Sequence, residues 1–131
     1  MKILEVTIEN AGKNLSAYIQ DIPGIITVGN NINDINKNIK EALKLYLEDN
    51  DNPPELLLGE YELKFKVDTA LFIVLYSDIF TKAALSRITG INQRQISHYA
   101  ANLHKPQKRQ ILRIQSGIDS VVQELSMISI V

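Results

Sequence analysis

The chain has 131 residues, a formal net charge of −1, 45% hydrophobic residues and 22% charged residues. These values predict one globular domain or two very small ones, and the absence of cysteine excludes disulfides and thiolate metal sites. The opening MKILEVTIEN lacks the apolar core of a signal peptide, and no apolar run approaches the ~20 residues of a membrane span. We therefore expect a cytoplasmic protein that does not enter a membrane.

The first half of the sequence predicts four strands and one helix. Alternating apolar and polar residues predict the strands, and apolar residues on one face at a 3.6-residue period predict the helix. The strands are Ile3–Glu9, Leu15–Asp21, Ile25–Gly29 and, after the helix Asp34–Glu48, Tyr61–Val67. The order β-β-β-α-β predicts an N-terminal domain at residues 1–67, in which one helix covers one face of a sheet. A module of this size is marginal alone, so we expect dimerisation or docking to stabilise it.

The second half, residues 68–131, predicts an all-α domain. The predicted helices are Thr69–Phe80, Lys82–Thr89, Asn92 to about Lys105, and Gln107 to about Leu125. The last helix carries an apolar inner face formed by Ile111, Ile114, Ile118, Val121, Val122 and Leu125. The apolar, β-branched end Met127–Val131 predicts a short C-terminal strand or a segment packed at a dimer interface. The fold class predicted for the whole chain is α+β.

The residues between Leu85 and Tyr99 have the spacing of a helix-turn-helix. Such a motif needs a small residue where the helices cross, a glycine at the turn, and apolar residues that anchor the second helix. The positions that meet these needs are Leu85, Ser86, Gly90, Ile91, Ile96 and Tyr99. Tyr99 is interpreted as a core residue rather than a stacking residue. The alternative is an αα-hairpin within an ordinary helical bundle.

The polar face of the second helix contains no acidic residue. A helix that enters a DNA groove avoids carboxylates, because they repel phosphate. The candidate DNA-binding residues are Gln93, Arg94, Gln95, Ser97, His98, Asn102, Lys105, Lys108 and Arg109. Arg94 and Gln95 lie near the helix N-terminus, where arginine can pair with guanine and glutamine with adenine. Asn102, Lys105 and the two cations that follow suit phosphates.

Two of these candidates have simpler interpretations. Gln95 stands three residues after Asn92, so it can instead close a capping box at the start of the helix. His98 can be an ordinary exposed histidine. We do not interpret it as a metal ligand, because His104 is six residues away and is predicted on a different face.

The charges of the chain are distributed unequally. Residues 1–79 contain 7 Lys and Arg against 13 Asp and Glu, whereas residues 80–131 contain 7 against 2. The net charges are therefore −6 and +5. A basic back half attracts phosphate, and an acidic front half suits a basic protein partner.

The sequence predicts no catalytic residues, no metal and no cofactor. A metal-dependent nuclease of the ribonuclease H type would need several carboxylates that converge from the strands. The strand acids are scattered and mostly on the predicted solvent side, namely Glu5, Glu9, Asp21 and Glu62. No nucleophile–base pair or phosphate-binding glycine loop accompanies them. We therefore expect a protein that is not an enzyme.

The chain resembles the HicB-type antitoxins of bacterial type II toxin–antitoxin systems. In the front half, YIQDIPGIITVGNNINDINKNIKEALKLYLED is similar to the family's strand, its PG and T.G positions, and its helix with an EAL run. In the back half, SHYAANLHKPQKRQILRIQSGI and the closing ELSMISIV are similar to the form that carries a helix-turn-helix. The resemblance covers nearly the whole chain.

The resemblance implies a partial ribonuclease-H-like N-terminal domain without catalytic activity and a C-terminal DNA-binding domain. It implies that the first domain binds and masks a HicA-like toxin, which cleaves mRNA. Candidate partner-binding residues in the strand that matches the family are Tyr18, Gln20 and Asp21. The second domain would bind double-stranded DNA at an inverted repeat in the operator of its own operon, as a dimer or tetramer. The alternative is a stand-alone transcriptional regulator whose N-terminal domain dimerises or senses a ligand.

Overall fold

A computed structural model describes all residues from 1 to 131 and has the predicted α+β class. A mixed four-stranded sheet with one helix is followed by four helices. The chain divides into two compact units, Met1–Val67 and Asp68–Val131, each described by itself below. None of the helices combines the length and the hydropathy needed to cross a bilayer.

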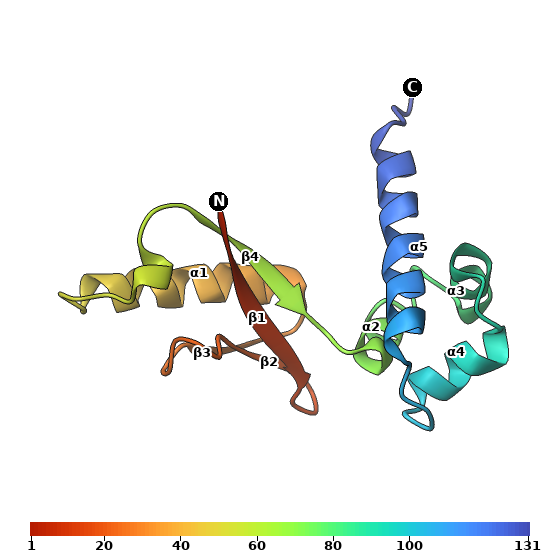
Figure 1. The fold of residues 1–131 in the computed structure, drawn as a ribbon, viewed down its shortest axis with the longest axis horizontal. Helices are drawn as coiled ribbons and strands as arrows, with labels where there is room; N and C mark the ends of the chain where they lie inside the picture. The colour runs from red at the N-terminus through yellow and green to blue at the C-terminus, as the bar shows by residue number, and fades with distance from the viewer. The chain divides into compact units, whose positions relative to one another are not determined.

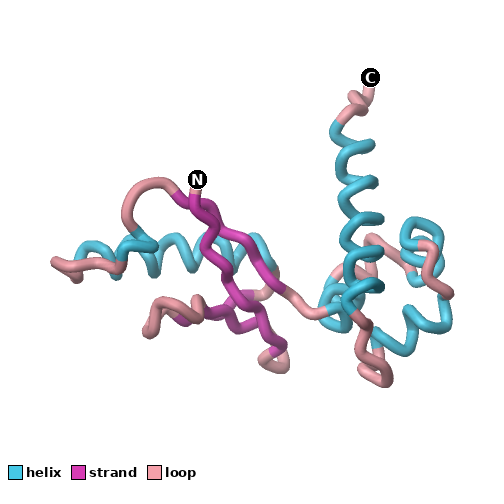
Figure 2. The backbone as a smooth tube through the Cα atoms, viewed as in Figure 1, coloured by secondary structure: helices cyan, strands magenta, loops and turns pink.

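The first unit is built on a sheet of strand order β3-β2-β1-β4 (Figures 1 and 2). The strands are β1 (Lys2–Asn10), β2 (Leu15–Tyr18), β3 (Ile26–Gly29) and β4 (Tyr61–Lys66). The first three are antiparallel neighbours, and β4 returns parallel to β1 after α1 (Ile32–Glu48) and the short 3-10 helix η1 (Glu55–Leu57). A parallel return needs such a crossover connection.

The helix α1 covers one face of this sheet and packs on β2 and β3. Its buried residues Ile35, Ile39 and Leu43 recur every four residues, which places them on a single face. Alternate strand residues such as Val6 and Ala17 fill the other side of this core. The opposite face of the sheet has no helix on it.

The second unit consists of four helices around one apolar core. They are α2 (Thr69–Leu75), α3 (Lys82–Thr89), α4 (Gln93–Ala100) and α5 (Lys108–Ser126). The core joins one or more residues from each helix: Ile73, Leu85, Ile91, Ile96, Tyr99 and Ile114. The predicted buried positions of the helix-turn-helix thus form the centre of this unit.

Two helices end earlier than periodicity predicts. The first, predicted to run to Phe80, stops at Leu75, and turns follow, because the polar pair Ser77 and Asp78 interrupts the apolar run. The second, predicted to run to about Lys105, stops at Ala100, because Asn102 adopts the left-handed conformation with φ 58°. Asparagine tolerates this conformation better than most residues. Leu103, predicted on the buried side, is consequently 69% exposed.

The predicted C-terminal strand is wrong for the single chain. Residues 127–131 follow α5 without entering a sheet. A strand needs a neighbouring strand edge, and the second unit contains only helices. The predicted inner face of α5 is also only partly correct, since Ile114 is buried whereas Ile111, Val122 and Leu125 are exposed.

Candidate nucleic-acid interface

The turn between α3 and α4 is held by glycine and by side-chain hydroxyls. Gly90 ends α3 with φ 73°, a conformation that side chains disfavour. The Ser86 hydroxyl donates to the carbonyl oxygen of Ile91 at 2.6 Å, across the turn. Thr89 Oγ1 accepts from the Ile91 N–H at 3.1 Å and donates to the Leu85 carbonyl at 2.6 Å. Ser86, the small residue where the two helices cross, therefore has a second role, because its hydroxyl holds the chain just before the second helix begins.

Arg113 of α5 also supports this turn, and sequence reasoning missed it. Its guanidinium donates to the Gly90 carbonyl oxygen at 2.9 Å and to Gln110 Oε1 at 3.1 Å. A Cβ added at Gly90 would lie 2.9 Å from the same guanidinium. The arginine therefore contributes a link between α5 and the motif in addition to its charge.

The helix α4 presents a polar face opposite its anchor. Ile96 and Tyr99 are buried, as predicted, and Asn92 caps the helix by accepting from the Arg94 N–H at 2.8 Å. Gln93 and Arg94 are exposed in the first turn of α4. In DNA-binding helix-turn-helix proteins, this end of the second helix usually reaches base edges. No acidic residue lies on this helix.

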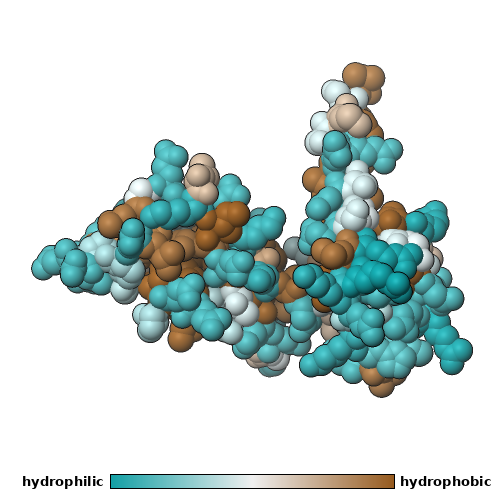
Figure 3. Space-filling view, viewed as in Figure 1, coloured by the Kyte–Doolittle hydropathy of each residue, from teal (hydrophilic) through white to brown (hydrophobic).

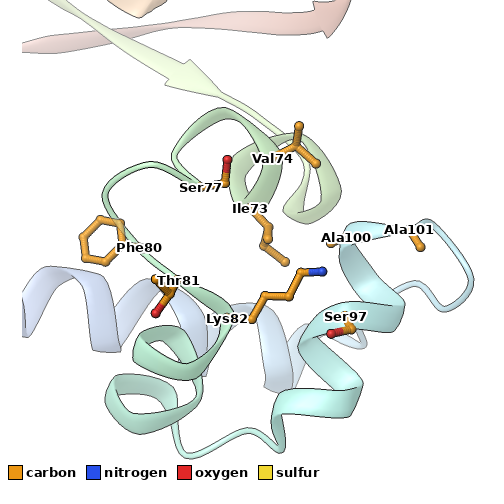
Figure 4. Close-up of a pocket in the computed structure, with 9 residues that line it drawn as sticks. All are labelled: Ile73, Val74, Ser77, Phe80, Thr81, Lys82, Ser97, Ala100 and Ala101. Atoms are coloured by element: carbon orange, nitrogen blue, oxygen red, sulfur yellow. The ribbon is translucent and has the colours of Figure 1, made fainter.

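A hollow of about 570 Å³ adjoins this polar face, between α2, the start of α3, and α4. Its floor is apolar and includes Ile73 and Phe80. Thr81, which caps α3, Lys82 from α3 and Ser97 from α4 also line it. Figure 4 shows the Lys82 side chain extending from α3 toward α4 across this hollow. Lys82 was not among the predicted DNA-binding residues, because nothing in the linear sequence brings it beside Ser97.

The loop after α4 turns back and brings His104, which was predicted on a different face, against His98 and Gln95. The His104 ring meets the His98 ring edge-on with centroids 4.7 Å apart. His104 Nδ1 also lies 3.2 Å from Gln95 Oε1. The prediction that the two histidines occupy different faces is therefore wrong, because the left-handed Asn102 reverses the chain after Ala100.

The capping-box interpretation of Gln95 is not confirmed either. Its side-chain oxygen contacts His104 rather than the backbone N–H of Asn92. Gln95 is half-buried on the side of α4 that faces this histidine. Of the two residues predicted to read bases, only Arg94 projects freely.

The remaining predicted contact residues lie beyond α4. Asn102 and Lys105 are exposed in the loop, and Lys108 and Arg109 are exposed in the first turn of α5. The single ion pair of the structure, Lys66 Nζ to Glu5 Oε2 at 3.1 Å, belongs to the first unit. No lysine or arginine of the second unit is paired with a carboxylate. Apart from Arg113, whose guanidinium is bound to the turn, these cations can attract phosphate.

The first unit offers a different surface, the uncovered face of its sheet. The strand register aligns Thr7, Tyr18 and Ile26 in one row across this face. Ile26 and Val28 of the edge strand are exposed, and the Tyr18 hydroxyl lies 3.4 Å from Glu9 Oε1. Gln20 and Asp21, the other two candidate partner-binding residues, are exposed in the turn after β2.

The carboxylates of the strands do not form a cluster. No group of three or more His, Asp or Glu side chains is arranged to hold a metal ion anywhere in the chain.

Comparisons with protein-family models, curated proteins and solved structures find no match to this chain.

Proposed function

We propose that this protein is a HicB-like antitoxin that represses its own operon. Its second unit binds an inverted-repeat operator in double-stranded DNA, and its first unit binds and masks a basic, HicA-like mRNA-cleaving toxin. The protein has no catalytic activity of its own in this proposal.

The proposal that the second unit binds DNA is supported by the surface of α4 and the residues around it. Arg94 projects from an acid-free helix that is anchored from behind by Ile96 and Tyr99. Lys82 and Ser97 line the hollow that adjoins this helix. A rigid helix with a free arginine at its N-terminus and cations around it suits insertion into a major groove, with phosphates held at the edges.

The proposal that the first unit binds a toxin is supported by the net negative charge of this unit and by the uncovered face of its sheet. Residues 1–67 hold 7 Lys and Arg against 11 Asp and Glu, and the uncovered face ends in an edge strand with exposed Ile26 and Val28. An excess of carboxylates in the unit suits a basic partner, and exposed apolar residues suit one that is partly apolar.

Two measurements test the proposal. The first is binding of the purified protein to its own promoter fragment, compared with scrambled DNA of equal length and at several salt concentrations. The second is co-expression with the adjacent open reading frame, followed by co-purification and a growth-rescue test.

The outcomes separate this function from its main alternative. Promoter binding with rescue supports the antitoxin. Promoter binding without any toxic or co-purifying neighbour favours a stand-alone regulator. Equal affinity for promoter and scrambled DNA would contradict operator recognition.

A further inference from the structure

The hollow between α2, α3 and α4 combines apolar walls with one lysine, and contact with DNA accounts only for the lysine. Its volume of about 570 Å³ lies within the range of small-molecule sites, about 300–1,000 Å³. Figure 3 shows mostly hydrophilic side chains over α3 and α4 on the side in view, so apolar walls are a local exception here. They are formed by Ile73, Val74, Phe80, Ala100 and Ala101.

Lys82 is the only charged residue that lines the hollow, and it has no acidic partner in the chain. Figure 4 shows its side chain extending from α3 toward α4, while Ile73 points from α2 toward the same space. A lysine packs its aliphatic stem on apolar side chains and keeps its ammonium group free for water or an anion. The hollow therefore places an unneutralised positive charge beside an apolar surface.

Two hydroxyl groups accompany the lysine. Ser97 of α4 lines the hollow and is half-buried. Thr81 Oγ1 accepts from the Ala84 N–H at 3.0 Å, which leaves the hydroxyl proton of Thr81 available to a ligand. A carboxylate only accepts hydrogen bonds, so it matches a site that offers an ammonium group and two hydroxyl donors.

We propose that this hollow binds a small amphipathic carboxylate. Its carboxylate would pair with Lys82, and its aliphatic or aromatic body would cover the apolar walls around Ile73. An uncharged ligand would leave the ammonium group without an anion. A small inorganic anion would leave the apolar walls in water. Only a ligand with both parts uses both features of the hollow, and its binding requires no DNA.

The ligand would also weaken DNA binding, and this part of the inference rests on the proposed operator binding. A carboxylate paired with Lys82 removes one cation that would otherwise attract a phosphate. The same ligand would lie against Ser97 of α4, the helix proposed to read bases. The hollow is therefore a site through which a carboxylate of this class would relieve repression.

The first test measures ligand binding to the full-length protein without DNA. The probes are decanoate and 2-naphthoate, each compared with its neutral amide, and acetate provides the charge without an apolar body. Backbone amide shifts in the NMR spectrum of isotope-labelled protein locate the site. At least one acid should bind with a dissociation constant below about 1 mM and shift the residues that line the hollow. Its amide and acetate should bind at least about tenfold more weakly.

Variants separate the charge of Lys82 from its packing. Lys82→Met keeps an aliphatic stem and should weaken binding of the acid at least about tenfold without changing the affinity for the amide. Lys82→Arg should retain binding of the acid. Ala101→Phe fills the hollow from an exposed position and should weaken acid and amide alike. Lys44→Met, at an exposed lysine of the first unit, is the matched control and should bind as wild type does.

Three results would overturn the proposed site. They are dissociation constants above about 1 mM for both acids, shifts confined to residues away from the hollow, and equal affinity of wild type and Lys82→Met for the acid. Circular dichroism on every variant shows whether a loss of binding comes from a loss of folding. Because the amide should still bind Lys82→Met, this variant also reports on the shape of its own hollow.

The second test measures promoter binding with saturating acid or amide at constant ionic strength. The acid should weaken operator affinity at least about threefold and lower the magnitude of the salt slope by about one, with no effect on Lys82→Met. Unchanged operator affinity with the hollow occupied would overturn the effect on repression. No promoter binding in any sample would disprove the proposed repressor and leave the carboxylate site intact.

Discussion

At the residue scale, the proposed DNA-binding surface depends on side chains whose exposure follows from one helical face. Arg94 could be predicted as exposed because Ile96 and Tyr99 fix the buried side of α4. Gln95, Asn102 and His104 could not be placed in the same way. Their positions depend on a reversal of the chain at a left-handed asparagine, and helical periodicity contains no information about that backbone conformation.

Replacing Arg94 should weaken operator binding and reduce its sequence preference. A guanidinium that pairs with a base edge contributes about 1–3 kcal/mol of discrimination, so Arg94→Ala should lose that amount on the operator and less on scrambled DNA. Arg94→Lys keeps the positive charge but cannot form a bidentate pair of hydrogen bonds with a base, so this variant should retain nonspecific DNA binding only. Fluorescence anisotropy on both DNAs measures these losses. Unchanged affinity in both variants would remove Arg94 from the base-reading residues.

Replacing Lys82 should act on all DNA sequences alike. Its side chain lines the hollow that Ser97 also lines, and in the proposed complex it can reach a phosphate. Lys82→Ala should lower the magnitude of the slope of log affinity against log salt by about one, and Lys105→Ala should do the same. Lys44→Ala, an exposed lysine of the first unit, is the matched control. An unaltered slope in Lys82→Ala would show that this side chain does not contact phosphate.

At the element scale, the pattern of α5 predicts its apolar stripe but not which part of the stripe is covered. Amphipathic spacing identifies the face of a helix that avoids water. Which turns are covered depends on where α3 ends and how closely α5 can approach it. That approach occurs at Gly117, whose added Cβ would lie 2.6 Å from the Ile88 carbonyl oxygen.

Gly117→Ala should destabilise the second unit. Alanine is normally better than glycine inside a helix by about 1 kcal/mol. Here the new methyl group would meet backbone atoms of α3, and overpacking of this kind costs about 1–3 kcal/mol, so the net change should be a loss. Urea unfolding followed by circular dichroism measures it. Ser116→Ala, the exposed neighbouring position, should be neutral or slightly stabilising, and equal stability of both variants would contradict the tight α3–α5 approach.

At the scale of the whole molecule, two compact units with opposite charge suggest two separable activities. Residues 1–67 hold 7 Lys and Arg against 11 Asp and Glu, and the only ion pair of the structure lies in this first unit, so the cations of the second unit are unpaired. The β-β-β-α-β order and the four helices could be predicted from periodicity, since both cores consist of residues at regular spacing. The predicted C-terminal strand is absent, because the helical second unit in which residues 127–131 lie offers them no strand edge.

Substitutions in the two units should therefore impair binding to different partners. Gln20→Lys/Asp21→Lys reverses the charge of the exposed turn after β2 and should weaken binding to a basic toxin at least about tenfold at low salt, because like charges would then face each other. The same protein should bind the operator within about twofold of wild type. Arg94→Ala should show the reverse pattern, with toxin rescue intact and repression lost. Co-purification, growth rescue and a promoter reporter measure the two activities in parallel. If either variant lost both activities while circular dichroism showed it to be folded, the two units would not act independently.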